Sequence, residues 1–205
     1  MENNIVPPTT TGKNVDLQET VKYATGAIAV DTFKRACKRL LNPPVWHKLS
    51  GRFSAAFFLV DNDGKVLERM AEQGDYFCID VPGPGPSLGD GYDWVKLELI
   101  QDKRDTLAEE ESFSMRLRAS NNPSKATKDT AHFFRETATS SFVISRKHNT
   151  VTVSYYGRNE QPNTSTEKTS DNVRNAMAAI GAAIGLSEIQ WKTLIKAFLQ
   201  DEIGG

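Results

Sequence analysis

The chain has 205 residues, of which 39% are hydrophobic and 25% are charged, and its net charge is −1. This length and composition are typical of one soluble domain that buries a core of its own. Because the chain carries no excess of positive charge, its composition argues against nucleic acid as a partner. The two cysteines, Cys37 and Cys78, lack the spacing of a disulfide framework or a zinc site, which favours free thiols in a reducing compartment.

The beginning of the chain has no apolar period. Residues 1–14 contain Asn, Pro and Thr, so we expect a disordered arm, followed by a single α+β domain over residues 15–205. The first residues lack the basic start and the apolar stretch of a signal peptide. The longest weakly polar run, residues 176–186, is too short to span a membrane. These features predict a cytoplasmic protein without a membrane span.

The first structured elements are predicted to be helical, with one short strand between them. Residues 16–23 can form one or two helical turns, and residues 26–30 can form a short strand. From Asp31, apolar residues recur at spacings of three and four, which predicts an amphipathic helix. The pair Pro43-Pro44 ends this helix, because the residue before a proline avoids the α region.

A series of strands follows, then two helices. Alternating or apolar runs bounded by turn residues predict strands at 53–60, 66–70, 75–81, 92–101, 112–118, 140–145 and 150–156. In the run 92–101, we expect Val95, Leu97 and Leu99 to face the core. Helical patterns cover 171–184 and 187–200, and residues 120–131 and 157–170 are predicted loops.

This order of elements predicts a curved antiparallel sheet of about six or seven strands packed on C-terminal helices. The order resembles that of the helix-grip superfamily, the START-like and polyketide-cyclase-like proteins, over residues 25–200. The resemblance rests on element order and not on a sequence motif. The split final helix and the long loops depart from the family pattern. The resemblance implies a cavity between the sheet and the last helix.

The segment 81–94 is the most unusual stretch, with four glycines and three prolines within residues 82–91. Such a composition excludes helix and central strand and predicts a shaped loop. The loop brings Asp90 and Asp93 together with Tyr92 and Trp94, a combination that suits a cavity mouth or a plain turn.

Candidates for acid–base chemistry are His132, Asp90 and Asp93, with Arg135 as a nearby cation. The alternative is structural: loop aspartates commonly accept hydrogen bonds from turn N–H groups, and the histidine can simply pack. No metal or phosphate motif has the required spacing, so the sequence predicts neither a metal nor another cofactor.

The strand-borne aromatic residues either fill the core or line a cavity. In the cavity interpretation, the ligand-binding residues are Tyr92, Trp94, Phe113, Tyr155 and Met177. Our leading hypothesis is therefore binding of a hydrophobic small molecule between the sheet and the C-terminal helices. Two alternatives stay open: an enzyme acting on a cyclic or carbonyl substrate in the same pocket, and a protein–protein interaction module, including a homodimer.

Overall fold

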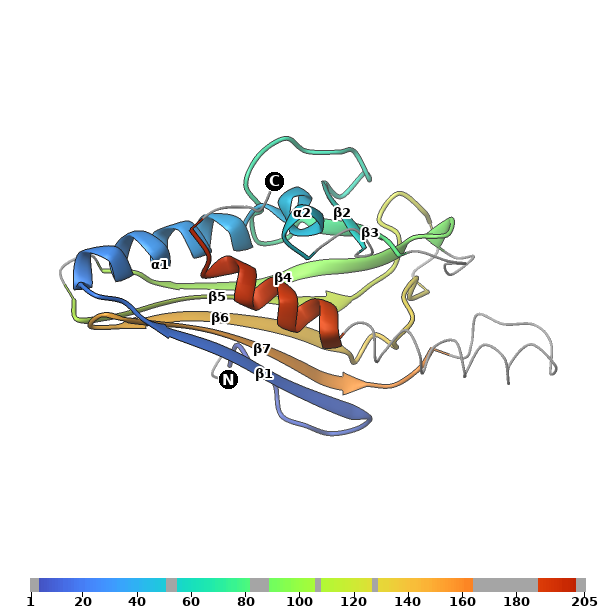
Figure 1. Cartoon of the computed structure of the whole chain (residues 1–205). Helices are drawn as coiled ribbons and strands as arrows, with labels where there is room; N and C mark the ends of the chain where they lie inside the picture. Colours follow the sequence, from blue (N-terminus) through green and yellow to red (C-terminus); the bar gives the residue numbers. More distant parts are fainter. Residues whose placement is uncertain are drawn as a thin grey trace.

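The computed structural model describes residues 4–50, 55–81, 89–105, 108–126, 129–163 and 188–201 (Figure 1). Its elements are β1 (Lys13–Lys22), α1 (Gly26–Leu40), the 3-10 turn η1 (Pro43–Val45), α2 (Trp46–Ser50), β2 (Ala56–Val60), β3 (Tyr76–Asp80), β4 (Asp93–Lys103), β5 (Glu110–Ala119), β6 (Thr139–Lys147) and β7 (Thr150–Glu160). Residues 188–198 form a further helix.

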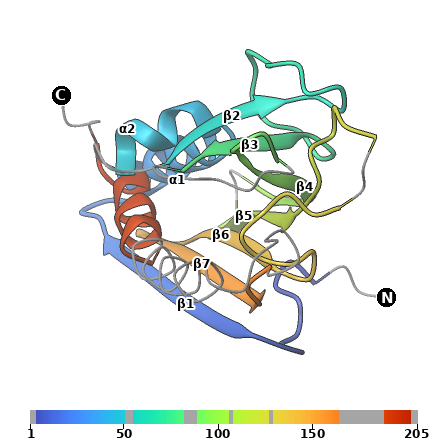
Figure 2. The ribbon, with the colours of Figure 1, turned by 90° about the vertical axis from the view of Figure 1, so that its right-hand side faces the viewer.

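The described strands form one antiparallel sheet in the order β1-β7-β6-β5-β4-β3-β2. Figure 2 shows that the sheet curves around α1, α2 and the helix at 188–198, which lie together on its concave side. This arrangement confirms the predicted α+β class, with a curved sheet packed on helices in a helix-grip-like order. Of the two predicted C-terminal helices, 171–184 lies outside the described residues, and the second is helical over 188–198.

The prediction for the first two elements was wrong. Residues 16–23 are not helical, because β1 pairs with β7 along almost its whole length and buries Val15. Residues 26–30 are not a strand but the first turns of α1, since the Thr25 hydroxyl caps the helix by accepting a hydrogen bond from the Ile28 N–H. In both places distant pairing or a local cap prevails over the weak periodicity of the sequence.

The alternation predicted along β4 fails at one residue. The register moves from Leu97 opposite Leu117 to Leu99 opposite Arg116, so Glu98 is an extra, bulged residue. After a bulge, every side chain changes face. Ile100 therefore packs against the core, while Leu99 lies on the side of Arg116.

An aromatic cluster fills the space between the described helices and the sheet. Trp46 is completely buried, and its ring centroid lies 5.1 Å from that of Phe57 and 5.4 Å from that of Phe142. Trp191, on the helix at 188–198, stacks on Tyr155 with centroids 5.0 Å apart and an interplanar angle of 18°. Such contacts add to the free energy of apolar burial. The described part of the sheet–helix interface is therefore packed with rings.

The described part of the N-terminal arm runs against the sheet. The side-chain oxygen of Asn159 accepts hydrogen bonds from the backbone N–H groups of Thr10 and Thr11 at 2.7 and 3.1 Å. The Ser141 hydroxyl donates to the Ile5 carbonyl at 2.7 Å, and Arg116 donates to the carbonyl of Asn4 at 2.6 Å. The division into an arm and one domain from residue 15 stays a prediction.

One further prediction concerns the edge of the sheet. Of the predicted edge strand at 66–70, only Val66 makes a bridge, to Val60.

Among the described helices, none combines the length and the apolar character that crossing a bilayer requires.

Candidate functional site

One end of the concave face carries ionisable side chains, and the segment 129–135 is fixed there by backbone hydrogen bonds. The N–H of Trp94 donates to Ala131 O at 2.8 Å, which joins the segment to β4. On the other side, Arg135 N donates to Gln161 O at 3.0 Å and Asn163 N donates to Phe133 O at 2.7 Å. The chain that leaves β7 thus holds His132 against the beginning of β4.

Asp93, the first residue of β4, is almost completely buried. Its Oδ1 accepts a hydrogen bond from Phe133 N at 2.7 Å and lies 3.9 Å from His132 Nδ1. Its Oδ2 has no hydrogen-bond partner among the described residues. Burial disfavours the charged carboxylate and raises the pKa of Asp93 to about 7, against the smaller opposing effect of the Phe133 N–H.

His132 is held as a neutral imidazole. Its Nδ1 accepts a hydrogen bond from Phe134 N at 2.9 Å, so the ring proton resides on Nε2. Burial lowers the pKa of His132 to about 4. Although Nδ1 and Asp93 Oδ1 lie within ion-pair distance, burial favours the neutral form of both groups, and an accepting Nδ1 carries no proton. The contact is therefore not an ion pair at neutral pH.

A partly open cavity of about 20 Å³ lies beside His132, enough for one water-sized group. Three further polar residues line it: Ser140, Glu160 and Thr139, whose buried Oγ1 has no partner among the described residues. Burial raises the pKa of Glu160 to about 7, and the nearby Glu188 adds to this shift while Lys13 opposes it. The remaining lining residues are apolar: Val95, Leu117, Ala119, Phe134 and Ala138. We call Asp93, His132, Thr139 and Glu160 the polar end.

A pair of hydroxyl groups connects the polar end to the aromatic core. The Ser140 and Tyr155 hydroxyls lie 3.1 Å apart, within hydrogen-bond distance. Burial raises the pKa of Tyr155 above its ordinary value, so the phenol stays protonated. Its ring stacks on Trp191. Tyr155 therefore lies at the boundary: its ring belongs to the aromatic core and its hydroxyl contacts Ser140 beside the polar end.

The structure brings together two of the four residues proposed for acid–base chemistry, Asp93 and His132. Asp90 lies apart from them in an exposed turn with φ of 58° and forms an ion pair with Lys125. The side chain of Arg135 is exposed, and only its backbone N–H takes part in fixing the segment.

The five residues proposed to bind a ligand do not form one set. Trp94 packs with Val60, Tyr76, Cys78 and Ala131 in a separate cluster, away from the main core, and Tyr92 is exposed. Phe113 and Tyr155 are buried within the main core. Met177 lies outside the described residues.

Thr139 and Glu160 were missed by the sequence analysis. Glu160 fell in the predicted loop 157–170, because the apolar alternation of β7 ends at Tyr155. The Glu160 side chain reaches the polar end because Asn159 has a φ of 58°. The Glu160 carboxylate then lies over Gly157, where a Cβ would collide with it. No local pattern signals this; it depends on a glycine and a left-handed asparagine in one strand.

The described residues contain no cluster of three or more His, Cys, Asp or Glu side chains arranged to hold a metal ion.

Comparison with known proteins gives structural similarity only. No family model matches the sequence, and no curated protein matches it. Among solved structures, the chain is similar to protein Ms6760 from Mycobacterium smegmatis, at 18% identity over 95% of this chain and 99% of that one, with a TM-score of 0.37. It is also similar to Ara h 8.0201, at 12% identity over 89% and 99%, with a TM-score of 0.30. A conserved protein from Geobacillus kaustophilus matches at 11% identity over 88% and 95%, with a TM-score of 0.32. The assignment of the fold rests on the strand order described above.

Proposed function

We propose that the protein binds a small, largely apolar molecule and holds the polar group of that molecule at the polar end. The observation that carries this proposal is the pair of buried oxygens, Asp93 Oδ2 and Thr139 Oγ1, that lack partners among the described residues. A buried polar atom without a hydrogen bond costs roughly 1–3 kcal/mol of folding free energy. Thr139 lines the cavity, so a ligand there that bonds to its Oγ1 recovers that cost; Asp93 is not a lining residue but lies 3.9 Å from His132, which is one.

The ligand belongs at this end and not beneath the helix at 188–198. There, the rings of Trp46, Trp191 and Phe142 occupy the described interface. At the polar end, the cavity has apolar walls on Val95, Leu117 and Phe134, on which the body of the ligand would lie. The existing cavity accommodates only the polar group, so binding requires the walls to separate.

The chemistry of the polar end favours a ligand with a hydroxyl or amino group. Asp93 and Glu160 make no ion pair with any lysine or arginine among the described residues, and the neutral His132 adds no positive charge. A ligand carboxylate would bring a third acidic group to this place, where Lys13 and Arg158 act on Glu160 only from a distance and form no ion pair with it. An alcohol can donate to a carboxyl oxygen and accept from His132 Nε2.

Native mass spectrometry of the whole chain with 1-decanol, decylamine and decanoate tests the proposal. We expect bound 1-decanol or decylamine, and weaker or no binding of decanoate. Thr139→Val keeps the shape of the side chain and removes one polar oxygen, so we expect weaker binding with no loss of stability. Thr152→Val is the matched control, since Thr152 is a half-buried strand threonine whose hydroxyl lies 3.0 Å from that of Thr20. Failure of all three probes to bind would contradict the proposal.

A second candidate function is proton transfer on a cyclic or carbonyl substrate. It is favoured by one observation: a carboxyl group with a pKa of about 7, Asp93, lies 3.9 Å from a neutral imidazole. A group that titrates near neutral pH can both accept and donate a proton. A binding protein returns its ligand unchanged, whereas an enzyme exchanges or converts it. NMR spectra of a cyclic ketone incubated in D2O with the protein separate the two, and Asp93→Asn would abolish the exchange.

A further inference from the structure

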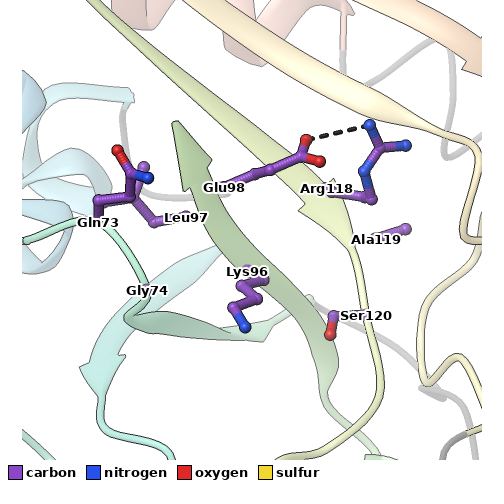
Figure 3. Close-up of a pocket in the computed structure, with 8 residues that line it drawn as sticks. All are labelled: Gln73, Gly74, Lys96, Leu97, Glu98, Arg118, Ala119 and Ser120. Atoms are coloured by element: carbon purple, nitrogen blue, oxygen red, sulfur yellow. Dashed lines mark ion pairs between the residues drawn. The ribbon is translucent and has the colours of Figure 1, made fainter. Parts of the chain in front are cut away.

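The convex face of the sheet carries a groove that the proposed function does not use. The groove has a volume of about 430 Å³, in the range of small-molecule sites. Lys96 and Glu98 of β4 form its floor with Arg118 of β5, and Gln73, Gly74 and Ser120 line its sides, as Figure 3 shows. Leu97 and Ala119 complete the lining.

Positive charge exceeds negative charge in and beside this groove. Glu98 Oε2 lies 2.8 Å from Arg116 Nε and 3.0 Å from Arg118 Nη2, so one carboxylate serves two guanidinium groups. The bulge in β4 places Glu98 between them. Lys96 forms no ion pair with any described residue, and its Nζ lies 5.2 Å from the centre of the Tyr76 ring. On β4 and β5, these three cations and one anion leave a charge of +2 at the groove, in a chain whose net charge is −1.

Lys96 and Arg118 are like charges on neighbouring strands, with their head groups turned to different partners. Lys96 Nζ lies over the Tyr76 ring of β3, and Arg118 bonds Glu98 and the carbonyl group of Glu136. The two residues are direct cross-strand partners on one face of the sheet. Like charges directly opposite each other destabilise an antiparallel pair. Glu98 relieves Arg118 but not Lys96. An anion in the groove would give Lys96 the ion pair that it lacks among the described residues.

Neutral polar groups complete the groove. The side-chain oxygen of Gln73 accepts from the Ile100 N–H at 3.2 Å, which leaves the amide NH2 group to donate. Ser120 also lines the groove, but its hydroxyl already donates to Asn121 Oδ1 at 3.3 Å, so it offers a ligand an acceptor and not a donor (Figure 3). Gly74 has a φ of 104° and open space where a Cβ would stand, so a ligand can approach its backbone closely.

We propose that this groove binds a phosphate group, held between Lys96 and Arg118. A phosphate dianion matches the two excess positive charges, and guanidinium groups bind its oxygens by charge-assisted hydrogen bonds. The volume exceeds that of one phosphate group, so the organic part of a phosphate monoester fits beside it.

Titration calorimetry and amide NMR shifts on the whole chain test this site with three probes: inorganic phosphate, glucose 6-phosphate and glucose. We expect both phosphates to bind, with shifts at the amides of Gly74 and Ser120, and affinity to fall as salt is added. Tighter binding of glucose 6-phosphate identifies a monoester site, and equal affinities identify a site for the phosphate group alone. Absence of heat and of shifts with both phosphates, or equal binding of glucose, overturns the proposal.

Matched variants separate the groove from the general charge of the surface. Lys96→Met should weaken phosphate binding by about tenfold, whereas Lys103→Met, an exposed lysine of the same strand, should leave it unchanged. Glu98→Gln should strengthen binding several-fold, because it removes the competing carboxylate. Equal losses for Lys96→Met and Lys103→Met, or weaker binding by Glu98→Gln, would overturn the assignment.

Discussion

A carboxyl group that is buried without a cation favours its neutral form, and this makes the free energy of unfolding depend on pH. Asp93 is such a group in this chain. Its pKa rises from 3.8 to about 7 because burial disfavours the charge. The folded state therefore retains a proton that the unfolded chain loses, over the window from about pH 4 to pH 7. The free energy of unfolding falls as the pH rises through this window.

Asp93→Asn should remove this dependence. The asparagine oxygen can still accept the hydrogen bond from Phe133 N, but the side chain carries no charge. We expect the variant to be more stable than the parent near pH 8 by about 2 kcal/mol, with the advantage shrinking near pH 5. Urea denaturation at the two pH values measures the difference. His132 and Glu160 also titrate, but they are present in both proteins.

Asp90→Asn is the matched control for this prediction. Asp90 is an exposed turn residue at φ of 58°, a conformation that asparagine adopts readily. We expect the free energy of unfolding of Asp90→Asn to equal that of the parent at both pH values. If Asp93→Asn behaves like Asp90→Asn, the carboxyl group of Asp93 is not the source of the pH dependence.

At the residue scale, the sequence pointed to half of the polar end. Asp93 and His132 were proposed because carboxyl and imidazole groups are the usual acid–base residues, although 39 positions separate them in the chain. Thr139 and Glu160 carried no such signal, since threonine is common in strands and Glu160 followed a predicted strand end. What makes these two significant is burial and a missing partner, and both are properties of the folded chain.

At the scale of elements, one buried ion pair joins β5 to β6. Arg146 Nε donates to Glu111 Oε1 at 2.6 Å, and both side chains are almost completely buried. The same guanidinium donates to the carbonyl groups of Ala108 at 2.7 Å and His148 at 3.1 Å. It thereby closes the loop before β5 against the turn between β6 and β7.

Arg146→Met should lower the free energy of unfolding by about 3 kcal/mol, because it leaves the buried Glu111 carboxylate without its cation. Denaturation by urea with circular dichroism measures the change. Lys147→Met is the control, since Lys147 and its partner Glu110 are both exposed, and it should leave the denaturation midpoint unchanged. The double variant Arg146→Met with Glu111→Leu should recover part of the loss. If it does not, the ion pair is not the cause.

Some strands are visible in the local sequence and others are not, for a physical reason. β5, β6 and β7 alternate apolar and polar residues because one face of each strand meets the core, and that pattern is visible locally. β1 owes its conformation to pairing with β7, which lies far away in the sequence: Lys22 pairs with Thr150, 128 residues later. The sequence of β1 itself alternates weakly. The bulge at Glu98 inserts one residue into a regular pattern, so Leu99 and Ile100 exchange faces without any change of composition.

At the scale of the whole molecule, Trp191 links the helix at 188–198 to the sheet. Its ring contacts Trp46, Phe57, Phe142 and Tyr155 with centroids 5.0 to 6.4 Å apart. The side chain of Arg39 fixes the end of the same helix by donating to the carbonyl of Ala197 at 2.9 Å and of Gln200 at 2.6 Å. The helix is thus held on the sheet by rings and on α1 by an arginine.

Trp191→Ala should therefore lower the free energy of unfolding by about 3 kcal/mol, through lost apolar contact and the cavity left behind. Thermal and urea denaturation measure this loss. Ile189→Ala is the matched control on the same helix, because Ile189 is 65% exposed and should change stability by less than about 0.5 kcal/mol. Similar effects of the two substitutions would mean that the helix contributes little through this packing.

The sequence by itself determined the class of the fold and most of its strands, because alternation, turn residues and proline positions act over a few residues. It could not decide the first strand, the face of each residue after the bulge, or which aromatic rings pack together. Nor could it assemble the polar end, whose members come from β4, the segment 129–135, β6 and β7. Those features depend on long-range strand pairing and on burial, which assign partners and shift pKa values only once the chain is folded.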